Sequence, residues 1–417
     1  MLVSLLFSCV PVGTLALEGQ ESEASEASEV FDPLPGAGDE GEGEEEEEEE
    51  EEEDAPAGSD QDLWDCADLF EQDRVPAYHL TLDHRTWTEL KSEFSAHDGT
   101  KGYHPVEAFE VDGESIPDVS IRLKGNEGYS WVGTKMQFVL SFVEVNEDQR
   151  FHGQRHVAFD ATWYDPTLLN NRVATRFLRR QGLPAPCANN ALMYINDEFY
   201  GIYTHMEEPD REYLERNFGD ENADGNLYKY GVELKNNPGA DTSRIEAFWS
   251  NYRFEEISQY GDPDQWVSEW AAEATMPDWD GYWISGHNYF IYDHPERGLM
   301  YMAWDLDATF GYYNAMTYDP LAGIYWSYVP HETSVLSQTE YEQRFIKYIA
   351  DYAARFDAEA MEAEVLEWDV QIRDWLDADP NKYYSLAEHD AAVLVQRQSF
   401  SARRDFLLAW TAANLNP

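Results

Sequence analysis

The sequence has few basic residues. Its 417 residues include 28 Lys and Arg against 83 Asp and Glu, which gives a formal net charge of −55. Residues 18–62 contain 22 acidic side chains and no basic one, so the remainder has 61 acids against 28 bases, about −33. A field of this sign repels phosphates, so a phosphorylated ligand would need a local basic pocket. The sequence therefore excludes nucleic acid as a main partner.

Cysteine and long apolar runs are also scarce. Three cysteines, Cys9, Cys66 and Cys187, are too few for a disulfide-based scaffold. After residue 17, no segment reaches the ~18 consecutive apolar residues that a membrane-spanning helix needs. With 43% hydrophobic and 14% aromatic residues, the chain nevertheless has enough apolar material for a large core.

The N-terminal segment is mostly apolar between Leu2 and Leu17 and contains no Lys or Arg, so it is similar to the hydrophobic part of a signal peptide. Within it, Leu6-Phe7-Ser8-Cys9 resembles a bacterial lipobox. We therefore expect an extracytoplasmic protein, either secreted or anchored to the membrane as a lipoprotein through Cys9. The alternative is an uncleaved segment or a wrongly assigned start.

These patterns predict four segments. Residues 1–17 are the signal or lipoprotein-like segment. Residues 18–62 cannot bury enough apolar surface to offset the entropy of ordering, and they are predicted to be an acidic disordered tether. Strand patterns dominate residues 63–206, and helical patterns dominate residues 207–417. The predicted fold class is α+β, with a sheet-rich N-lobe, a helix-rich C-lobe and a cleft between them.

Periodicity predicts individual elements within the two lobes. Residues 106–111 and 119–123 flank Asp112-Gly113-Glu114 and are predicted to pair as a hairpin. Further strands are expected at residues 135–142, 191–195 and 199–206, and helices at residues 166–180 and 211–218.

Asp305 and Asp307 carry the clearest chemical signal. They follow the apolar, strand-like run Tyr301-Met302-Ala303-Trp304, and side chains two residues apart in a strand lie on the same face. Adjacent carboxylates repel each other unless a cation or a base lies between them, so the pair predicts a metal site. Upstream, Asp280 and Asn288 add oxygen ligands of the kind that Mg²⁺ takes together with phosphate oxygens.

Each of these acids has an alternative role. Asp280 is a metal ligand, an acceptor of a hydroxyl proton, or a turn-forming residue. Asp307 is a second metal ligand or the partner of a nearby base. Asp278 is expected to cap a helix or a turn. The histidines show no spacing typical of zinc, and no nucleophile elbow is present.

Three bases stand out because bases are rare: Arg122, Lys124 and Lys135 lie on or beside predicted strands. Arg122 and Lys124 share a strand face, and the neighbouring glycines at 125 and 128 allow a ligand to approach the backbone closely. We expect phosphate to bind here. The alternative is that each base pairs with one of the abundant surface acids.

Several motifs occur in order along residues 63–410. They are Arg122-Leu123-Lys124-Gly125-Asn126, Lys135, the run from Tyr194 to Tyr203 with Glu207, Gly225-Asn226-Leu227-Tyr228-Lys229, Asp280-Gly281-Tyr282 with Asn288, and Trp304-Asp305-Leu306-Asp307 with Phe310-Gly311. Together they resemble the CotH spore-coat kinase family. One element departs from the family pattern: Ser-Ser usually follows Gly-Asn, whereas here Asn126 is followed by Glu127-Gly128.

The resemblance implies an atypical, secretory-type protein kinase with a two-lobed kinase-like fold that uses ATP and Mg²⁺ or Mn²⁺. By position, Asp280 resembles the catalytic acid that accepts the substrate hydroxyl proton. Asp305 resembles the metal-binding acid, with Asn288 and Asp307 as further metal contacts. The residues expected to hold ATP are Arg122, Lys124, Lys135 and Lys229, with Glu207 near the hinge between the lobes.

The sequence thus predicts a secreted or lipid-anchored bacterial kinase, similar to a spore coat protein, that transfers the ATP γ-phosphoryl group to Ser or Thr of an extracytoplasmic protein. Two alternatives remain open. The same fold would also suit a nucleotidyl transferase, because related folds host different chemistries. A non-catalytic surface adhesin or assembly factor is favoured by Glu127, because an acid beside phosphates is repulsive.

Overall fold

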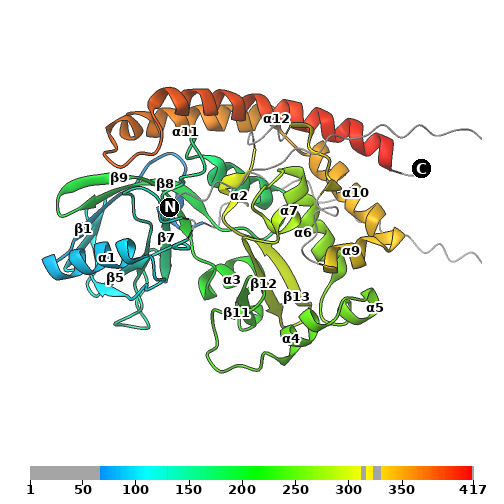
Figure 1. The fold of residues 1–417 in the computed structure, drawn as a ribbon, viewed down its shortest axis with the longest axis horizontal. Helices are drawn as coiled ribbons and strands as arrows, with labels where there is room; N and C mark the ends of the chain where they lie inside the picture. The colour runs from blue at the N-terminus through cyan, green and yellow to red at the C-terminus, as the bar shows by residue number, and fades with distance from the viewer. Residues whose placement is uncertain (1–65, 129, 311–315, 323–329, 416–417) are drawn as a thin grey trace, which may run out of the picture. The chain divides into compact units, whose positions relative to one another are not determined.

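A computed structural model describes residues 66–128, 130–310, 316–322 and 330–415 (Figure 1). The segments predicted as a signal sequence and an acidic tether, residues 1–62, lie outside this range. The described chain is a mixed α+β fold, with a curled nine-stranded sheet followed by a smaller sheet and a C-terminal helical region. The predicted α+β class is confirmed, whereas the two-lobed kinase-like arrangement stays a prediction.

The nine-stranded sheet has the strand order β2-β5-β6-β7-β9-β8-β1-β3-β4. Its strands are β1 (Ala77–Thr81), β2 (His104–Pro105), β3 (Ala108–Val111), β4 (Glu114–Ser115), β5 (Ser120–Leu123), β6 (Phe138–Ser141), β7 (His156–Asp160), β8 (Ala188–Ile195) and β9 (Glu198–Glu207). The two ends of the sheet meet along residues 104–111, where the Val106 amide donates to the Val119 carbonyl before β5 at 2.9 Å and the Glu107 amide donates to the Thr81 carbonyl of β1 at 2.8 Å. The Phe109 ring on β3 packs edge-on against Phe142 and Phe151, which closes the apolar core inside the curl.

The predicted hairpin between residues 106–111 and 119–123 is wrong in its pairing. Strand β3 pairs with β1 and β4, whereas β5 pairs with β2 and β6, near the opposite end of the sheet. The predicted turn is present at the predicted position, where Asp112 and Gly113 both have positive φ angles. This tight turn folds the short β4 back on β3, and the chain then crosses to the other end of the sheet.

Other predicted elements are confirmed with shifted ends. The hairpin of β8 and β9 and helix α3 (Arg211–Phe218) lie where the sequence predicts them. The strand expected at residues 135–142 is shorter, since β6 begins at Phe138. The helix expected at residues 166–180 begins later, as α2 (Asn170–Arg180), because the Asp165 carboxylate accepts from the Thr167 and Asn170 amides and holds a turn before it.

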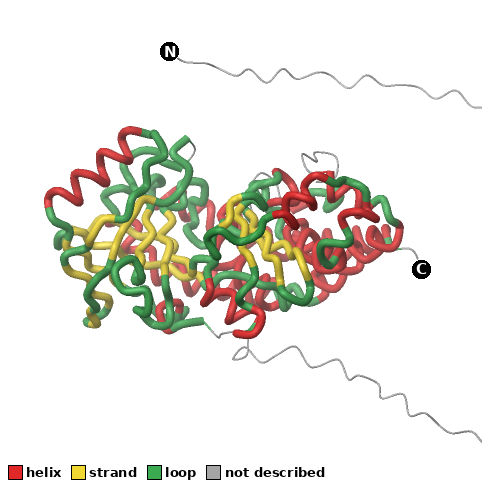
Figure 2. Tube along the Cα trace, turned by 90° about the horizontal axis from the view of Figure 1, so that it is seen from below, coloured by secondary structure: helices red, strands yellow, loops and turns green. Residues whose placement is uncertain are grey.

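A second sheet has the order β11-β10-β12-β13 and lies beside the first in the tube view (Figure 2). Its strands are β10 (Asn226–Lys229), β11 (Glu233–Leu234), β12 (Tyr289–His294) and β13 (Gly298–Ala303). The outer edge of β13 is satisfied by side chains of helix α6 (Pro263–Thr275) instead of by a strand. Gln265 exchanges two hydrogen bonds with Tyr301, and Glu269 Oε1 accepts from the Ala303 amide at 2.9 Å.

Helices make up most of the described chain after β11, apart from β12 and β13. Besides α1 (His84–Ala96), the remaining helices are α4 (Ser243–Ser250), α5 (Phe254–Ile257), α7 (Tyr282–Ser285), α9 (Pro330–Leu336), α10 (Thr339–Ala354), α11 (Ala358–Ala378) and α12 (Leu386–Asn414). Short 3₁₀ turns are η1 (Asp68–Phe70), η2 (Asp220–Asn222) and η3 (Leu306–Ala308). Ser385 begins α12 with a capping box to Glu388.

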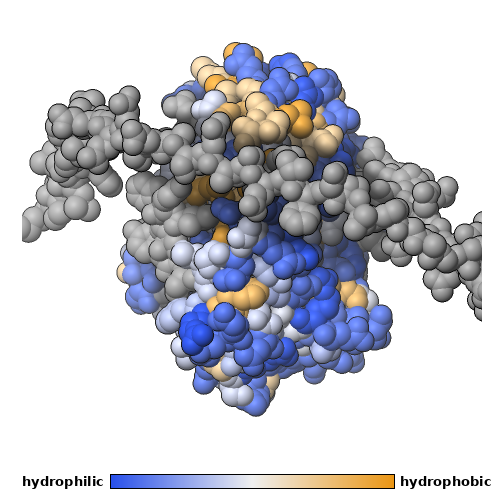
Figure 3. Space-filling view, turned by 90° about the vertical axis from the view of Figure 1, so that its right-hand side faces the viewer, coloured by the Kyte–Doolittle hydropathy of each residue, from blue (hydrophilic) through white to orange (hydrophobic). Residues whose placement is uncertain are grey.

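Polar and apolar side chains are unevenly distributed on the surface. In the view of Figure 3, the lower part is mainly hydrophilic, and apolar side chains gather at the top. Among the described residues, no helix combines the length and apolar character needed to cross a membrane.

Cys66, at the start of the described chain, forms a disulfide with Cys187, just before β8. This is one cross-link, in agreement with the absence of a disulfide-based scaffold.

Glu269 gives a pH-dependent prediction for the β13 edge. Burial raises the pKa of this carboxyl to about 8. The folded state therefore holds the proton more tightly than the unfolded chain, and Glu269 costs stability as pH rises from about 4.5 to about 8. Glu269→Gln keeps the acceptor for Ala303 without the charge. The free energy of unfolding of the variant should exceed that of the wild type by ~1 kcal/mol or more at pH 9, and the gap should shrink at pH 5.

Chemical denaturation of both proteins at the two pH values measures this gap. Glu110→Gln, at an exposed position on β3, controls for the general effect of a Glu-to-Gln change. An equal gap at pH 5 and pH 9 would show that Glu269 does not carry the pH dependence.

Candidate active site

Several polar residues meet where strands of the two sheets end. Lys124 follows β5 and Asp160 ends β7 in the large sheet, while Asp305 follows β13 in the small one. The Lys124 ammonium lies 2.6 Å from Asp160 Oδ2 and 3.8 Å from Asp305 Oδ2. Burial alone would lower the pKa of Lys124, but the two carboxylates more than offset this and raise it. Lys124 is therefore a permanent cation that joins the two sheets.

Asp305 is placed by a turn and not by a strand. Strand β13 ends at Ala303, Asp305 has a φ of 58°, and residues 306–308 form the 3₁₀ turn η3. The expectation that Asp305 and Asp307 share one strand face is thus wrong. The reason lies in α2: Asn171 accepts from the Leu306 amide at 2.7 Å, and Asn170 donates to the Asp307 carbonyl at 2.7 Å. These side chains satisfy backbone groups that a neighbouring strand would otherwise bind.

The carboxyl of Asp305 has an unsatisfied oxygen. Its Oδ1 is buried and has no hydrogen-bond partner among the described residues. Burial raises the pKa of Asp305 to about 6, while Lys124 opposes this rise. Burial, with the nearby Asp305 charge, also raises the pKa of Asp307 well above its usual range. A buried carboxylate oxygen without a partner is costly, and a cation would remove that cost.

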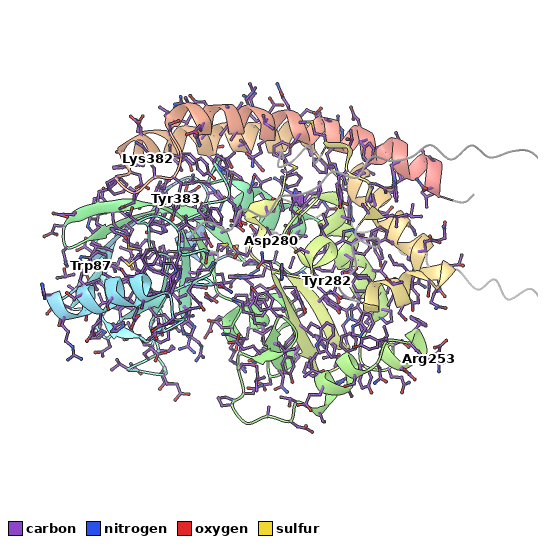
Figure 4. All side chains as sticks on the ribbon, viewed as in Figure 1. Trp87, Arg253, Asp280, Tyr282, Lys382 and Tyr383 are labelled. Carbon is purple, nitrogen blue, oxygen red and sulfur yellow. A yellow bond between two sulfur atoms is a disulfide. The ribbon has the colours of Figure 1, made fainter. Side chains whose placement is uncertain are left out.

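Asp280 and Asn288 form a second pair beside this group. Asn288 Nδ2 donates to Asp280 Oδ2 at 2.9 Å, and His287 Nδ1 lies 3.5 Å from Asp280 Oδ1. Asp280 is exposed at the position labelled in Figure 4, and its charge acts on the Asp305 carboxyl. Asp278 accepts from the Asp280 amide at 3.3 Å, which agrees with its predicted role as a turn cap. The Asp280 carboxylate therefore faces solvent in a fixed orientation.

Two partly buried bases have no carboxylate within ion-pair distance among the described residues. Lys229 ends β10 with its ammonium 5.4 Å from the centre of the Tyr230 ring, and burial lowers its pKa. The Arg122 guanidinium lies 5.2 Å from the centre of the Tyr103 ring. Because these partly buried cations lack a carboxylate partner, an anionic ligand such as phosphate would stabilise them.

Lys135 and Glu207 face other partners. The Lys135 ammonium, 2% exposed, lies 2.6 Å from Asp379 and donates to the Ile202 carbonyl. Glu207 is buried, accepts from the Cys187 amide and forms an ion pair with Arg216. Its neighbour Glu208 acts on the pKa of both Lys124 and Lys229 and so lies nearer the site. The expected roles of Lys135 and Glu207 toward ATP stay predictions.

Glu127, the departure from the family pattern, is close to a base. Its Oε2 lies 4.0 Å from Lys101 Nζ, which also donates to the Gly125 carbonyl. Lys101 therefore partly offsets the charge of Glu127 in the segment after β5 that contains Gly125 and Gly128, called here the glycine loop. Sequence reasoning missed both Lys101 and Asp160. For Asp160 a signal existed, because the apolar run Val157-Ala158-Phe159 delivers a carboxylate at a strand end, as the run before Asp305 does.

The residues present fit a hard divalent cation together with phosphates. Among the described residues, no three His, Cys, Asp or Glu side chains are arranged as a ready-made metal site. Mg²⁺ commonly binds through one or two carboxylates, with waters and substrate phosphates as the other ligands. The unsatisfied Asp305 oxygen suits that mode. Asn288 and Asp307 stay predicted ligands.

A phosphoryl-transfer enzyme requires carboxylates that bind a cation and nearby bases that bind phosphates. The residues described above include both kinds of group. The comparison with family models agrees: the model described as CotH kinase protein matches residues 121–414. The chain therefore belongs to the CotH kinase family, which implies a kinase that uses ATP.

Individual relatives are distant. Inner spore coat protein H of Bacillus subtilis is 22% identical over 354 residues, covering 76% of this chain and 92% of that protein. Spore coat protein homolog 1 and invasin CotH7 of Rhizopus delemar are 29% and 27% identical over 177 and 175 residues. Each of these two matches covers 35% of this chain and 29% of the relative.

Replacing Lys229 by Met should separate ligand binding from stability. The substitution removes an unpaired, half-buried ammonium, so the free energy of unfolding should stay equal or rise. ATP affinity should fall by roughly 1.5–3 kcal/mol, the usual value of a charged hydrogen bond. Calorimetric titration with Mg²⁺–ATP measures the affinity, and Lys347→Met, at an exposed position on α10, is the control. Unchanged affinity in Lys229→Met would remove this residue from the phosphate site.

Proposed function

We propose that this protein is an extracytoplasmic protein kinase that transfers the γ-phosphoryl group of ATP to Ser or Thr of an exported protein. The observation that carries the proposal is the Lys124 ammonium held between Asp160 and Asp305, next to an unsatisfied Asp305 oxygen. Membership of the CotH kinase family supports the nucleotide, and the position of Asp280 supports transfer to a hydroxyl group.

Each residue near the site has a distinct proposed role. Asp305 would hold the Mg²⁺ or Mn²⁺ ion, with Asn288 and Asp307 as further contacts. Arg122, Lys124 and Lys229 would bind phosphate oxygens. When bound, ATP would supply the electrophilic phosphorus, and the metal ion would offset the charge that develops on the phosphate oxygens. Asp280 would orient the acceptor hydroxyl and take its proton, since its carboxylate is exposed to an incoming substrate and fixed by Asn288.

The two-lobed arrangement is part of the same proposal. Lys124 and Asp160 come from residues 63–206, whereas Lys229, Asp280 and Asp305 come from residues 207–417. Substrates would thus bind where the sheet-rich N-lobe meets the helix-rich C-lobe. The two proposed lobes do not have separate apolar cores, because Val173, Phe177 and Ile202 of the N-lobe pack in the same apolar cluster as the C-terminal helices.

Localisation outside the cytoplasm is proposed on two grounds. Disulfides persist mainly in oxidising compartments, and Cys66 and Cys187 are bonded. The apolar segment before the acidic residues 18–62 is similar to an export signal. The protein substrate is proposed only by class, as an exported protein with an accessible Ser or Thr.

A non-catalytic surface protein is the rival function, because one Rhizopus relative is named an invasin. Glu127 was the main argument for that alternative from the residues of this chain. Its proximity to Lys101 weakens the argument, since a nearby base reduces repulsion of phosphate.

Two substitutions test the proposed roles. Asp305→Ala should abolish phosphoryl transfer with little loss of stability, because it removes the metal ligand and leaves the β13 edge intact. Asp280→Asn should bind Mg²⁺–ATP normally and lose turnover by ~100-fold or more, as expected for a group that acts on the acceptor proton. Incubation with ³²P-labelled ATP measures autophosphorylation or transfer to a generic protein substrate.

The product mass decides between reaction types. One added phosphoryl group supports the kinase, and a nucleotidyl group supports the transferase. The absence of both products and of thermal stabilisation by Mg²⁺–ATP supports the non-catalytic protein. Full activity of Asp305→Ala would contradict the metal assignment.

The disulfide gives a separate prediction. It closes a loop of 121 residues, so its removal should increase the entropy of the unfolded chain. Cys66→Ser with Cys187→Ser should lower the free energy of unfolding by about 2–5 kcal/mol. Denaturant unfolding with and without reductant measures this, and Cys9→Ser is the control. A reductant that leaves wild-type unfolding unchanged would show that the bond does not form.

A further inference from the structure

The tip of the C-terminal helical hairpin contacts the large sheet. Helices α11 and α12 are joined by residues 379–385, called here the tip loop. In Figure 4, the labelled Lys382 and Tyr383 lie over the sheet, apart from Asp280. Tyr384 and Asn381 donate to the carbonyls of Trp163 and Tyr200. The hairpin thus reaches from the helical region to the sheet that carries Lys124.

The strongest contact of the tip loop is a buried ion pair. Asp379 Oδ2 accepts from Lys135 Nζ at 2.6 Å and from the Ile202 amide at 3.0 Å. Both side chains are at most 2% exposed. Gly201 permits this approach, since a Cβ there would lie 2.7 Å from Asp379 Oδ2. The Lys135 ammonium is therefore buried between Asp379 of the tip loop and the Ile202 carbonyl of β9.

The tip loop also holds the backbone before β6. The Tyr383 hydroxyl donates to the Val132 carbonyl at 2.9 Å and to the Lys135 carbonyl at 3.2 Å. The Thr134 hydroxyl donates to Asn381 Oδ1 at 3.0 Å. Residues 132–135, which belong to no strand or helix, are thus fixed from outside the sheet.

This fixed segment leads directly to Lys124 and the glycine loop. Trp131 is buried, and its indole nitrogen donates to the Lys124 carbonyl at 2.7 Å. Gln137 donates to the Ser130 carbonyl at 3.2 Å and accepts the Lys124 amide on its own carbonyl at 2.9 Å. The contacts form one connected series from Asp379 and Tyr383 to Lys124 and Ser130.

We propose that Asp379 is a positioning residue for nucleotide binding. Lys135 then contributes to this binding through its ion pair with Asp379 and not as a ligand of phosphate. Asp379 neutralises Lys135 inside the sheet and thereby holds residues 131–137 in place. These residues in turn fix the positions of Lys124 and the glycine loop, which would bind the phosphates of ATP. This inference rests on the proposed function only for the identity of the ligand. The C-terminal hairpin thereby becomes part of the nucleotide site without touching the nucleotide.

The sign of the effect of Asp379→Asn distinguishes the two roles of Lys135. If Lys135 binds phosphate directly, neutralising Asp379 frees the ammonium, and ATP affinity should stay equal or rise. If Asp379 positions the loop, ATP affinity should fall roughly 2- to 30-fold, the range found for coupling through packed networks. Calorimetric titration with Mg²⁺–ATP measures affinity. Steady-state kinetics should show the loss mainly in KM for ATP and less in kcat.

Hydrogen exchange in the nucleotide-free protein is the second readout. Peptides covering residues 124–136 should exchange faster in Asp379→Asn than in Asp390→Asn, which breaks the Arg373 ion pair in the same hairpin. Tyr383→Phe should show the same changes to a smaller extent and serves if Asp379→Asn does not fold. Equal exchange and equal ATP affinity in Asp379→Asn and Asp390→Asn would overturn the proposal.

The two readouts separate this inference from the proposed function. A wild type that binds no ATP contradicts the proposed function, whereas the exchange comparison still decides whether Asp379 positions residues 124–136. A wild type that binds ATP, with affinity unchanged or increased by Asp379→Asn, contradicts the positioning role and leaves the kinase assignment intact.

Discussion

The site depends on one buried cation shared between two acids. Lys124 leaves the large sheet and bonds to Asp160, and its second carboxylate neighbour, Asp305, belongs to the small sheet. Removing Lys124 or Asp160 leaves a buried charge without its counterpart, which costs more than the pair contributes, whereas removing Asp305 leaves Lys124 bonded to Asp160. The contact between Lys124 and Asp305 therefore links the two sheets at the site, and the Asn170 and Asn171 side chains also hold the turn that carries Asp305.

Sequence patterns named candidate residues of the site but did not predict how the backbone places them. Local patterns were enough to name Asp305, an acid after an apolar run, and Asp280, an acid before a glycine, with Asn288 as a further oxygen ligand. Asp160 was missed although the same signal precedes it. The strand expected to carry Asp305 and Asp307 is a turn, because Asn170 and Asn171 supply its hydrogen bonds from more than a hundred residues away. Periodicity within one segment contains no information on such partners.

In the fold, too, features set by neighbouring residues could be predicted, whereas features set by residues far apart in the sequence could not. The turn at Asp112-Gly113 and the hairpin of β8 and β9 were predictable, since short turns are encoded by the residues in them. The pairing of β3 with β1 and of β5 with β6 was not, because the curl of a nine-stranded sheet decides which edges meet. The burial of Lys135 depends on Asp379, 244 residues later, and no local pattern indicates it.

The way in which α6 covers β13 has a consequence for self-association. An open sheet edge offers N–H and C=O groups to a strand from another molecule, and such edges nucleate aggregates. Here Gln265, Trp266 and Glu269 already occupy the Tyr301, Leu299 and Ala303 groups. The strand that leads to Asp305 is thus closed to strand addition, and its register cannot slip without breaking side-chain bonds from a helix.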